Sequence, residues 1–321
     1  MKDGPARLRT PDTVDIDWLS EVLGTPALRF DASAESANWS SHLRLRVTLA
    51  DGSTRALRLK VCQGTTFGRS EVDYYTQDYL GLAAPPLVRC HDAVFVPGAG
   101  YHLLLDDLAE THHDRRDEPP TLDYGLAVAE ALARMHAPHW QSRPAPAVSA
   151  LDRHFDEIRP GVPVLERMTG LALAEVFATH EAALRRRWAD PRGMSLLHGD
   201  LNGSNVLTPR GASAPVLLLD RQPFDWSLTY GLAVHDLAYF MVPWWPEVAC
   251  AAWAEPVLRR WHATLAQPDY DWASVLDDWR LSVRQCLHVP FEWCSKPETA
   301  SRMRWLWETQ LRRILAATAG I

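Results

Sequence analysis

Lysine is scarce in this chain of 321 residues: among its 33 basic residues, only Lys2, Lys60 and Lys296 are lysines. Long hydrophobic runs are also missing, since no stretch approaches the roughly 18 apolar residues of a transmembrane helix. The N-terminal sequence MKDGPARLRTPD has no apolar segment of the signal-peptide kind. These absences predict a cytoplasmic protein without a membrane segment. Because lysine is so rare in this chain, a lysine inside a strand points to a specific role for that residue.

Cysteine and positive charge are limited too. The five cysteines are an odd number and form no C-x-x-C pair, which argues against a disulfide framework and a structural zinc site. The formal net charge of -7 argues against nucleic-acid binding as the main function. It is compatible with a cationic small-molecule partner.

Residues 43–61 have the pattern of a β-hairpin. Apolar and polar residues alternate on both sides of a turn that contains Asp51-Gly52. In the return strand RALRLKV, Lys60 falls on the opposite face from Leu59. The pattern therefore predicts that Lys60 leaves the apolar face of its strand.

The rest of the chain changes from mixed to helical patterns. We predict a helix over 68–80 with Ser70 as its N-cap, a buried strand at 101–105, and a helix over 121–140 closed by Pro138. Two short apolar strands then precede acidic residues, and helical patterns dominate from residue 232. The sequence thus predicts an α+β fold with a β-rich N-terminal lobe (1–108) and a larger helical C-terminal lobe (109–321).

The stretch LLHGDLNGSNVL (196–207) carries the spacing H-x-D-x-x-x-x-N at His198, Asp200 and Asn205. Phosphoryl transfer needs a carboxylate for the proton of the attacking hydroxyl and a nearby oxygen ligand for magnesium. The kinase catalytic-loop spacing supplies both from one turn. Taken alone, this pattern is weak and favours a polar turn, because three polar residues at fixed offsets occur by chance in many loops.

Further residues in kinase-like order favour the catalytic interpretation. Asp220 ends the strand VLLLD, and a hairpin would place it beside the loop as a second magnesium ligand. Lys60 could contact nucleotide phosphates, and Glu71 on the following helix could hold that lysine. Their alternatives are a turn-capping aspartate, a surface lysine and a first-turn glutamate stabilised by the helix dipole. The joint order makes these alternatives hard to sustain.

The motifs LLHGDLNGSNVL, LLLD and HDLAYFM resemble the aminoglycoside phosphotransferase and choline kinase family, which has a protein-kinase-like fold. Glu71-x-x-Tyr74-Tyr75 after Lys60, together with HLLLDDL (102–108), is similar to its ecdysteroid-kinase-like branch. The resemblance covers about residues 30–245. Two departures are the glycine-free stretch SANWSSH (36–42), where a phosphate-covering loop is expected, and Arg221, where the family commonly has an aromatic residue.

The resemblance implies a role for each matching position. Asp200 would be the catalytic base, with His198 supporting its loop, and Asp236 would be structural. The implied nucleotide-binding and metal-binding residues form a larger set: Lys60 and Glu71 near the phosphates, the hinge residues Asp106 and Leu108 near adenine, and Asn205 and Asp220 on Mg²⁺.

We therefore expect an ATP- and Mg²⁺-dependent kinase, with GTP as the alternative nucleotide, that phosphorylates a hydroxyl of a small molecule. An antibiotic is the favoured acceptor, in resistance or self-protection. The alternatives are a metabolic small-alcohol or sugar kinase and a catalytically silent nucleotide-binding module. The tryptophans of PWWP (243–246), FEWC (291–294) and RWLW (304–307) either line a pocket for a cationic or aromatic acceptor or pack helices together.

Overall fold

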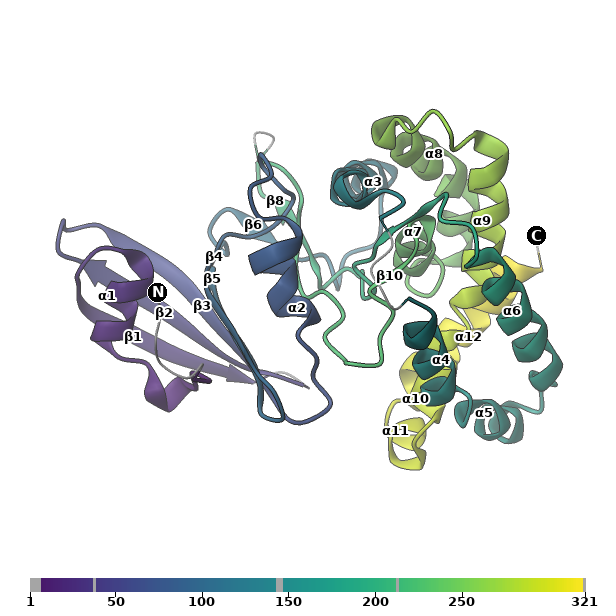
Figure 1. Ribbon diagram of the computed structural model, residues 1–321, viewed down its shortest axis with the longest axis horizontal. Coiled ribbons are helices and arrows are strands. Elements are labelled where there is room, and N and C mark those ends of the chain that lie inside the picture. The colour runs from purple at the N-terminus through teal and green to yellow at the C-terminus, as the bar shows by residue number, and fades with distance from the viewer. Residues whose placement is uncertain (1–6, 37–38, 143–146, 212–213, 320–321) are drawn as a thin grey trace. The chain divides into compact units, whose positions relative to one another are not determined.

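The computed structural model describes residues 7–36, 39–142, 147–211 and 214–319 (Figure 1). The chain divides into two compact units. The first comprises Met1–His113 and Leu207–Asp225, and the second comprises Asp114–Val206 and Trp226–Ile321. The assignment of residues 1–108 to nucleotide binding and 109–321 to catalysis and acceptor binding stays a prediction.

The first unit is built on a five-stranded antiparallel sheet with the order β1-β2-β3-β5-β4. Its strands are β1 (Ala27–Ser36), β2 (Ser41–Leu49), β3 (Thr54–Gln63), β4 (Cys90–Val96) and β5 (Gly100–Asp106). The predicted hairpin is confirmed, since β2 pairs with β3 around a turn in which Gly52 has φ +80°. The predicted strand at 101–105 is β5. The expected phosphate-covering loop is the β1–β2 connection, part of which (37–38) lies outside the described residues.

The two faces of this sheet contact different partners because side chains alternate along each strand. Leu57 and Leu59 of β3 pack with Trp18 and Leu19 of helix α1 (Ile16–Leu23), which lies over the sheet in Figure 1. On the opposite face of the sheet, Tyr101, Leu103 and Leu105 of β5 pack with Val72 of helix α2 (Ser70–Asp73). A short 3₁₀ helix, η1 (Pro11–Thr13), precedes α1.

Helix α2 continues directly into a π-helical segment, η2 (Tyr74–Asp78). The prediction that Ser70 caps this helix is wrong, because the N-cap is Arg69 and makes no side-chain cap hydrogen bond. The Ser70 hydroxyl instead donates to the carbonyl oxygen of Gln222 at 2.8 Å. The serine therefore joins two distant segments of the chain rather than closing its own helix.

A second, three-stranded sheet has the order β6-β8-β9. It consists of β6 (His112–His113), β8 (Val206–Pro209) and β9 (Leu217–Leu218). Strands β8 and β9 are hydrogen-bonded neighbours, in agreement with the predicted pair of strands before Asp220. Within the first unit, Leu218 also donates its backbone N–H to the carbonyl of Pro86 at 2.7 Å, which holds β9 against the segment that precedes β4.

The second unit is mainly helical, as the sequence predicts. Helices α3 and α8 pack together, as do α7 and α9. Its helices are α3 (Leu122–His136), η3 (Ala137–His139), α4 (Ala147–Ile158), α5 (Gly161–Thr169), α6 (Ala174–Arg187), α7 (Val234–Met241), α8 (Glu247–Leu265), α9 (Trp272–Gln285), α10 (His288–Cys294), α11 (Pro297–Arg302) and α12 (Arg304–Thr318). Within the described ranges, no helix has the length and apolar character needed to cross a membrane. Trp245 and Trp307 are buried between helices, whereas Trp305 is 70% exposed.

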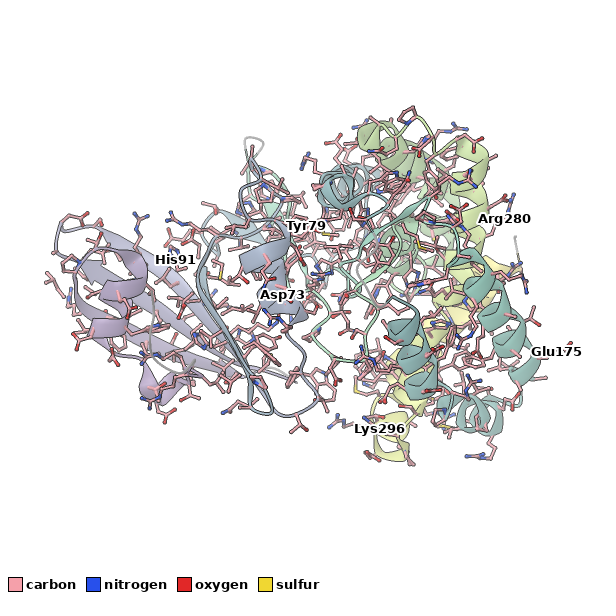
Figure 2. The ribbon with its side chains drawn as sticks, viewed as in Figure 1. Asp73, Tyr79, His91, Glu175, Arg280 and Lys296 are labelled. Atoms are coloured by element: carbon pink, nitrogen blue, oxygen red, sulfur yellow. The ribbon has the colours of Figure 1, made fainter. Side chains whose placement is uncertain are left out.

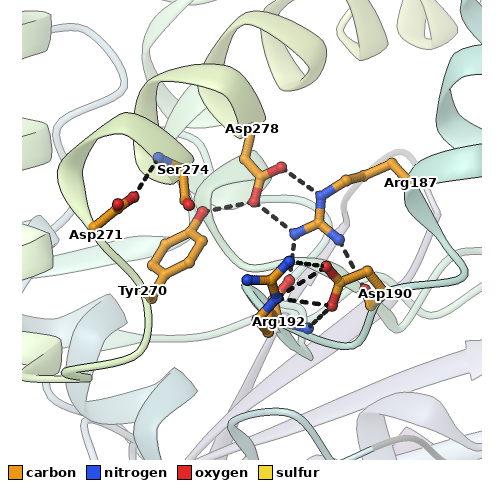
Figure 3. Close-up of polar contacts among 7 residues, drawn as sticks. All are labelled: Arg187, Asp190, Arg192, Tyr270, Asp271, Ser274 and Asp278. Atoms are coloured by element: carbon orange, nitrogen blue, oxygen red, sulfur yellow. Dashed lines mark hydrogen bonds and ion pairs between the residues drawn. The ribbon is translucent and has the colours of Figure 1, made fainter.

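The strand pair of this unit, β7 (Met194–Leu196) with β10 (Tyr230–Leu232), begins next to a polar network (Figure 3). Arg187, the last residue of α6, donates to both carboxylate oxygens of Asp278 on α9 at 2.7 and 2.8 Å. Tyr270 donates to the same carboxylate at 2.7 Å, and Arg187 also donates to the carbonyl of Asp190. The network holds the segment that leads into β7 in place, and the loop at 197–205 follows directly after β7.

Three buried histidines from three helices contact one another in the same unit. His154 of α4 and His288 of α10 share a hydrogen bond of 2.9 Å between ring nitrogens, and the His180 ring of α6 lies 5.2 Å from that of His288. Burial lowers the pKa of His154 to about 3 and that of His180 to about 4. Burial also lowers the pKa of His288, and the neighbouring His235 of α7 adds to this effect. All three are therefore neutral at pH 7.

This cluster predicts acid sensitivity. The folded state resists protonation while the unfolded chain takes up protons below about pH 6.5, so stability is full above that pH and falls as pH drops towards 4. Each histidine contributes a loss of ~1.4 kcal/mol per pH unit in that window. Urea unfolding at pH 7.5 and 5.0 should show the loss, and His180→Leu should reduce it. His139→Gln, outside the cluster, is the control; an equal pH dependence in all three proteins would contradict the prediction.

Candidate active site

In the first unit, Lys60 of β3 forms a buried ion pair with Glu71 of α2. The Lys60 Nζ lies 2.9 Å from Glu71 Oε1 and 2.8 Å from Oε2. Lys60 is 5% exposed and Glu71 is fully buried. The hydroxyl of Tyr101 on β5 donates to Glu71 Oε2, so the glutamate is fixed from the sheet as well as by the lysine. The alternation along β3 predicted that Lys60 lies on the face opposite Leu59, and the structure agrees.

Asp220 completes this cluster. Its Oδ1 accepts from Lys60 Nζ at 3.1 Å, and its side chain is 35% exposed. Burial alone would lower the pKa of Lys60, but the carboxylates of Asp220 and Glu71 outweigh burial and raise it. Lys60 is thus a permanent cation between two carboxylates, the arrangement expected of a lysine that binds phosphate oxygens.

The backbone of Asp220 is strained. Its φ of +58° lies in the left-handed region, which a residue with a Cβ adopts at a cost of about 1–3 kcal/mol. Such a conformation persists only where the surroundings hold it, and it is most frequent at functional sites. The fixed φ orients the Asp220 carboxylate towards Lys60.

The predicted hinge residues Asp106 and Leu108 lie at the end of β5 and just after it. The Asp106 carboxylate interacts with Nε2 of His91 at 2.7 Å, and its backbone N–H donates to Arg89. The carbonyl of Leu108 accepts the N–H groups of Thr111 and His112 at 2.9 and 2.8 Å. Both lone pairs of that carbonyl are therefore engaged, and Leu108 could bind an adenine only through its amide.

In the second unit, the loop that contains Asp200 is held by Asp236 of α7. The fully buried Asp236 carboxylate accepts the backbone N–H groups of His198 and Gly199 at 2.8 and 2.9 Å. It also contacts Nε2 of His136 at 3.0 Å. Because the indole N–H of Trp261 donates to His136 Nδ1, the proton of a neutral His136 is on Nε2 and points to Asp236. The predicted structural role of Asp236 agrees with this geometry.

The Asp200 carboxylate is held by donors on both oxygens. Asn205 Nδ2 donates to Oδ2 at 3.2 Å and to the Asp200 carbonyl at 2.7 Å. The Tyr239 hydroxyl donates to Oδ1 at 2.9 Å, and Asn202 Nδ2 lies 3.4 Å from the same atom. Asp200 is partly exposed and Asn205 is buried. The carboxylate is thus fixed in place and still reachable by a hydroxyl.

One residue of this site was missed by sequence reasoning. Tyr239 lies three residues after Asp236 on α7, and that helical spacing could have indicated that both face the loop. Glu292 of α10 belongs to FEWC (291–294), which the sequence offered as a possible lining of an acceptor pocket. Burial and the nearby Asp200 charge raise the pKa of Glu292 to about 8. Its proximity to Asp200 was not predicted, because the two residues are distant in sequence.

The structure brings together the predicted residues of each unit. Lys60, Glu71 and Asp220 contact one another in the first unit, and Asp200 and Asn205 do so in the second. The donor types agree with a magnesium site, since Asp220 offers a carboxylate. Asn205 uses its amide nitrogen towards Asp200, so the predicted metal contact of Asn205 would use its carbonyl oxygen.

Comparisons by sequence find no matching protein-family model and no matching curated protein. Solved structures do match. An aminoglycoside phosphotransferase from Alicyclobacillus acidocaldarius has a TM-score of 0.55 and 12% identity, over 99% of this chain and 97% of its own. An ethanolamine kinase from Plasmodium vivax has a TM-score of 0.55 and 10% identity, over 89% and 81%. An aminoglycoside-3'-phosphotransferase of type VIII has a TM-score of 0.51 and 21% identity, over 84% and 98%.

The chain has the fold of the small-molecule kinases. This result confirms the predicted α+β, protein-kinase-like fold and agrees with the resemblance to the aminoglycoside phosphotransferase and choline kinase family. The roles of individual residues, and the resemblance to the ecdysteroid-kinase-like branch, stay predictions. At these identities the likeness establishes the fold alone.

Proposed function

We propose that this chain is an ATP- and Mg²⁺-dependent phosphotransferase that acts on a hydroxyl of a small molecule. One observation carries the proposal: Lys60, buried in a strand, contacts the carboxylates of both Glu71 and Asp220. Burying a charged lysine is costly unless the lysine is paired. In this chain, where nearly all basic residues are arginines, the position nevertheless carries a lysine. A phosphate-binding role accounts for this lysine.

Lys60 would contact the phosphate oxygens of ATP, while Glu71 keeps the ammonium group in place. The adenine would bind the backbone at the hinge residues Asp106 to Leu108, through the Leu108 amide. Asp220 and Asn205 would hold Mg²⁺, which supplies charge neutralisation on the phosphates.

Asp200 would act as the base in the transfer. The acceptor hydroxyl oxygen forms a bond to the γ-phosphorus, its proton passes to Asp200, and the bond from the γ-phosphorus to the β–γ bridging oxygen breaks to release ADP. Asn205 and Tyr239 hold the carboxylate in one orientation. Alignment and charge stabilisation would provide most of the rate enhancement.

An antibiotic is the favoured acceptor, supported by the motif resemblance and by two neighbours named as aminoglycoside phosphotransferases. Glu292 is partly exposed and lies near Asp200. It would favour an acceptor with an ammonium group, because an ion pair with that group would stabilise the charged form of Glu292 and lower its raised pKa of about 8. The ethanolamine kinase neighbour supports a second candidate, a metabolic kinase for an amino alcohol. A sugar kinase and a silent nucleotide-binding module are the remaining alternatives.

A mass-spectrometric screen tests the proposal. The protein is incubated with Mg²⁺, ATP and a panel of aminoglycosides, other antibiotics, amino alcohols and sugars, and products are searched for an added phosphoryl group. Phosphorylation by the wild type and not by Asp200→Asn supports the proposal and identifies the acceptor class. Binding of ATP without transfer to any acceptor would favour the silent module.

Tyr239→Phe tests the orientation of the base. The Tyr239 hydroxyl stabilises the charged form of Asp200, so its loss should move the acidic limb of the kcat–pH profile to higher pH. We expect kcat at pH 7 to fall about tenfold, the value of one hydrogen bond to a charged group. The KM for ATP should not change. Stopped initial-rate assays between pH 5 and 9 measure both effects.

Tyr124→Phe is the matched control, because Tyr124 packs against Phe240 on the same helix as Tyr239. Its hydroxyl makes no hydrogen bond in the structure. This variant should retain the wild-type profile. An unchanged acidic limb in Tyr239→Phe would show that the tyrosine does not act through Asp200.

A further inference from the structure

The chain that follows Asp220 is hydrogen-bonded to the segment around helix α2. The backbone N–H of Gly68 donates to the carbonyl of Pro223 at 2.8 Å, and that of Asp225 donates to Thr66 at 3.2 Å. The Ser70 hydroxyl donates to the carbonyl of Gln222. There is little room between these segments, since a Cβ added at Gly68 would lie 3.0 Å from the Cα of Asp225. Residues 221–225 and the start of α2 therefore form one packed assembly.

Arg221 extends this attachment to the far end of the same helical segment. Its guanidinium donates to the Asp78 carboxylate at the end of η2 and lies 5.6 Å from the centroid of the Tyr74 ring. Figure 2 marks the course of this segment by Asp73 and Tyr79. The Arg221 side chain is 2% exposed, so its charge is removed from water and needs paired partners, of which Asp78 carries the opposite charge.

Asp220 lies between two fixed points. On one side its carboxylate accepts from Lys60, and on the other its backbone continues into the buried Arg221. The left-handed φ of Asp220 has to be imposed by neighbours. The Arg221–Asp78 pair is the charged contact immediately next to the strained residue, and it joins that residue to the helical segment that carries Glu71.

We propose that Arg221 is a positioning residue for the metal site: its pair with Asp78 holds Asp220 in the orientation that binds Mg²⁺. This inference rests on the proposed function. It also gives a role to an arginine that replaces the aromatic residue expected from the resemblance. Here the charge pair with Asp78 and the contact with the Tyr74 ring hold the loop. Loss of either charge should therefore weaken Mg²⁺ binding rather than ATP binding as such.

Calorimetric titration with ATP, in Mg²⁺ and in EDTA, tests the proposal. The dissociation constant of ATP in EDTA, divided by that in Mg²⁺, measures how much the metal contributes to ATP binding. Arg221→Met keeps most of the side-chain length without the charge, and Asp78→Asn removes the partner's charge. Each should reduce the ratio about tenfold or more, as substitutions behind a metal ligand do. The dissociation constant in EDTA should stay within about twofold of the wild type.

Arg69→Met is the matched control, because Arg69 forms an exposed ion pair with Asp73 on the same helix. It should leave the ratio unchanged. The single variants leave one charge of the pair without its partner and could misfold for that reason. The double variant Arg221→Met with Asp78→Leu removes both charges, and apolar replacements of this kind commonly preserve folding. This double variant should show the same reduced ratio as Arg221→Met.

The outcomes separate the two proposals. A wild-type ratio retained in the folded double variant overturns the positioning role and leaves the proposed function intact. An equal loss of affinity in Mg²⁺ and EDTA also overturns it, since that pattern indicates general damage to the nucleotide site. Failure of the wild type to bind ATP in either condition overturns the proposed function itself. A reduced ratio in the pair variants, with Arg69→Met unchanged, supports the inference.

Discussion

Replacement of Asp200 by asparagine should lower kcat by about 10³-fold, within the range for loss of a positioned general base. Asparagine has nearly the same shape and can still accept from Tyr239, so the loop should remain folded. What it loses is the ability to take the proton of the acceptor hydroxyl. Because Asp200 lies outside the Lys60 cluster, ATP affinity should change little. Initial rates and equilibrium ATP binding measure the two quantities separately.

The control for this variant is Asp277→Asn. The Asp277 side chain is 77% exposed on α9 and pairs with Arg280 at the surface. Its loss should not affect kcat. If Asp200→Asn retained more than about a tenth of wild-type activity on the acceptor identified by the screen, Asp200 would not be the base.

Replacement of Lys60 by methionine should have two large effects. It leaves Glu71 as a buried carboxylate without a cation, which should destabilise the protein by about 3 kcal/mol or more. It also removes the proposed phosphate contact, so ATP affinity should fall by at least about tenfold. Denaturant unfolding and ATP titration measure the two losses.

Combination with Glu71→Gln separates these effects. In Lys60→Met with Glu71→Gln no fully buried carboxylate is left without a cation, since Asp220, the other partner of Lys60, is 35% exposed to solvent. Tyr101 can still donate to the glutamine oxygen. Stability should recover for the most part, whereas ATP affinity should not. Recovery of both in the double variant would mean that Lys60 stabilises the fold without binding phosphate.

The sequence predicts those features whose causes are local. The alternation along β2 and β3 and the Asp51-Gly52 turn specify the hairpin, and the hairpin determines which face carries Lys60. The spacing within LLHGDLNGSNVL likewise places Asp200 and Asn205 in one turn, where they are hydrogen-bonded. In both cases the relevant partners lie within a few residues of one another.

Features that depend on distant partners were not predicted. Ser70 has the residue type and the position of an N-cap, yet its hydroxyl bonds to Gln222, 152 residues away. The role of Arg221 depends on Asp78, 143 residues earlier, and that of Glu292 on its packing near Asp200. Capping and charge patterns describe one segment at a time, so they cannot identify such tertiary contacts.

The discontinuity of the first unit has a consequence for the order in which the protein can be assembled during synthesis. Residues up to His113 emerge first and include Lys60 and Glu71, but the segment Leu207–Asp225 follows much later. Until it emerges, Lys60 has no Asp220, Ser70 has no Gln222 and Asp78 has no Arg221. Nearly a hundred residues of the second unit are therefore synthesised before the Lys60–Asp220 and Asp78–Arg221 pairs can form, and no single cut in the chain yields two complete units.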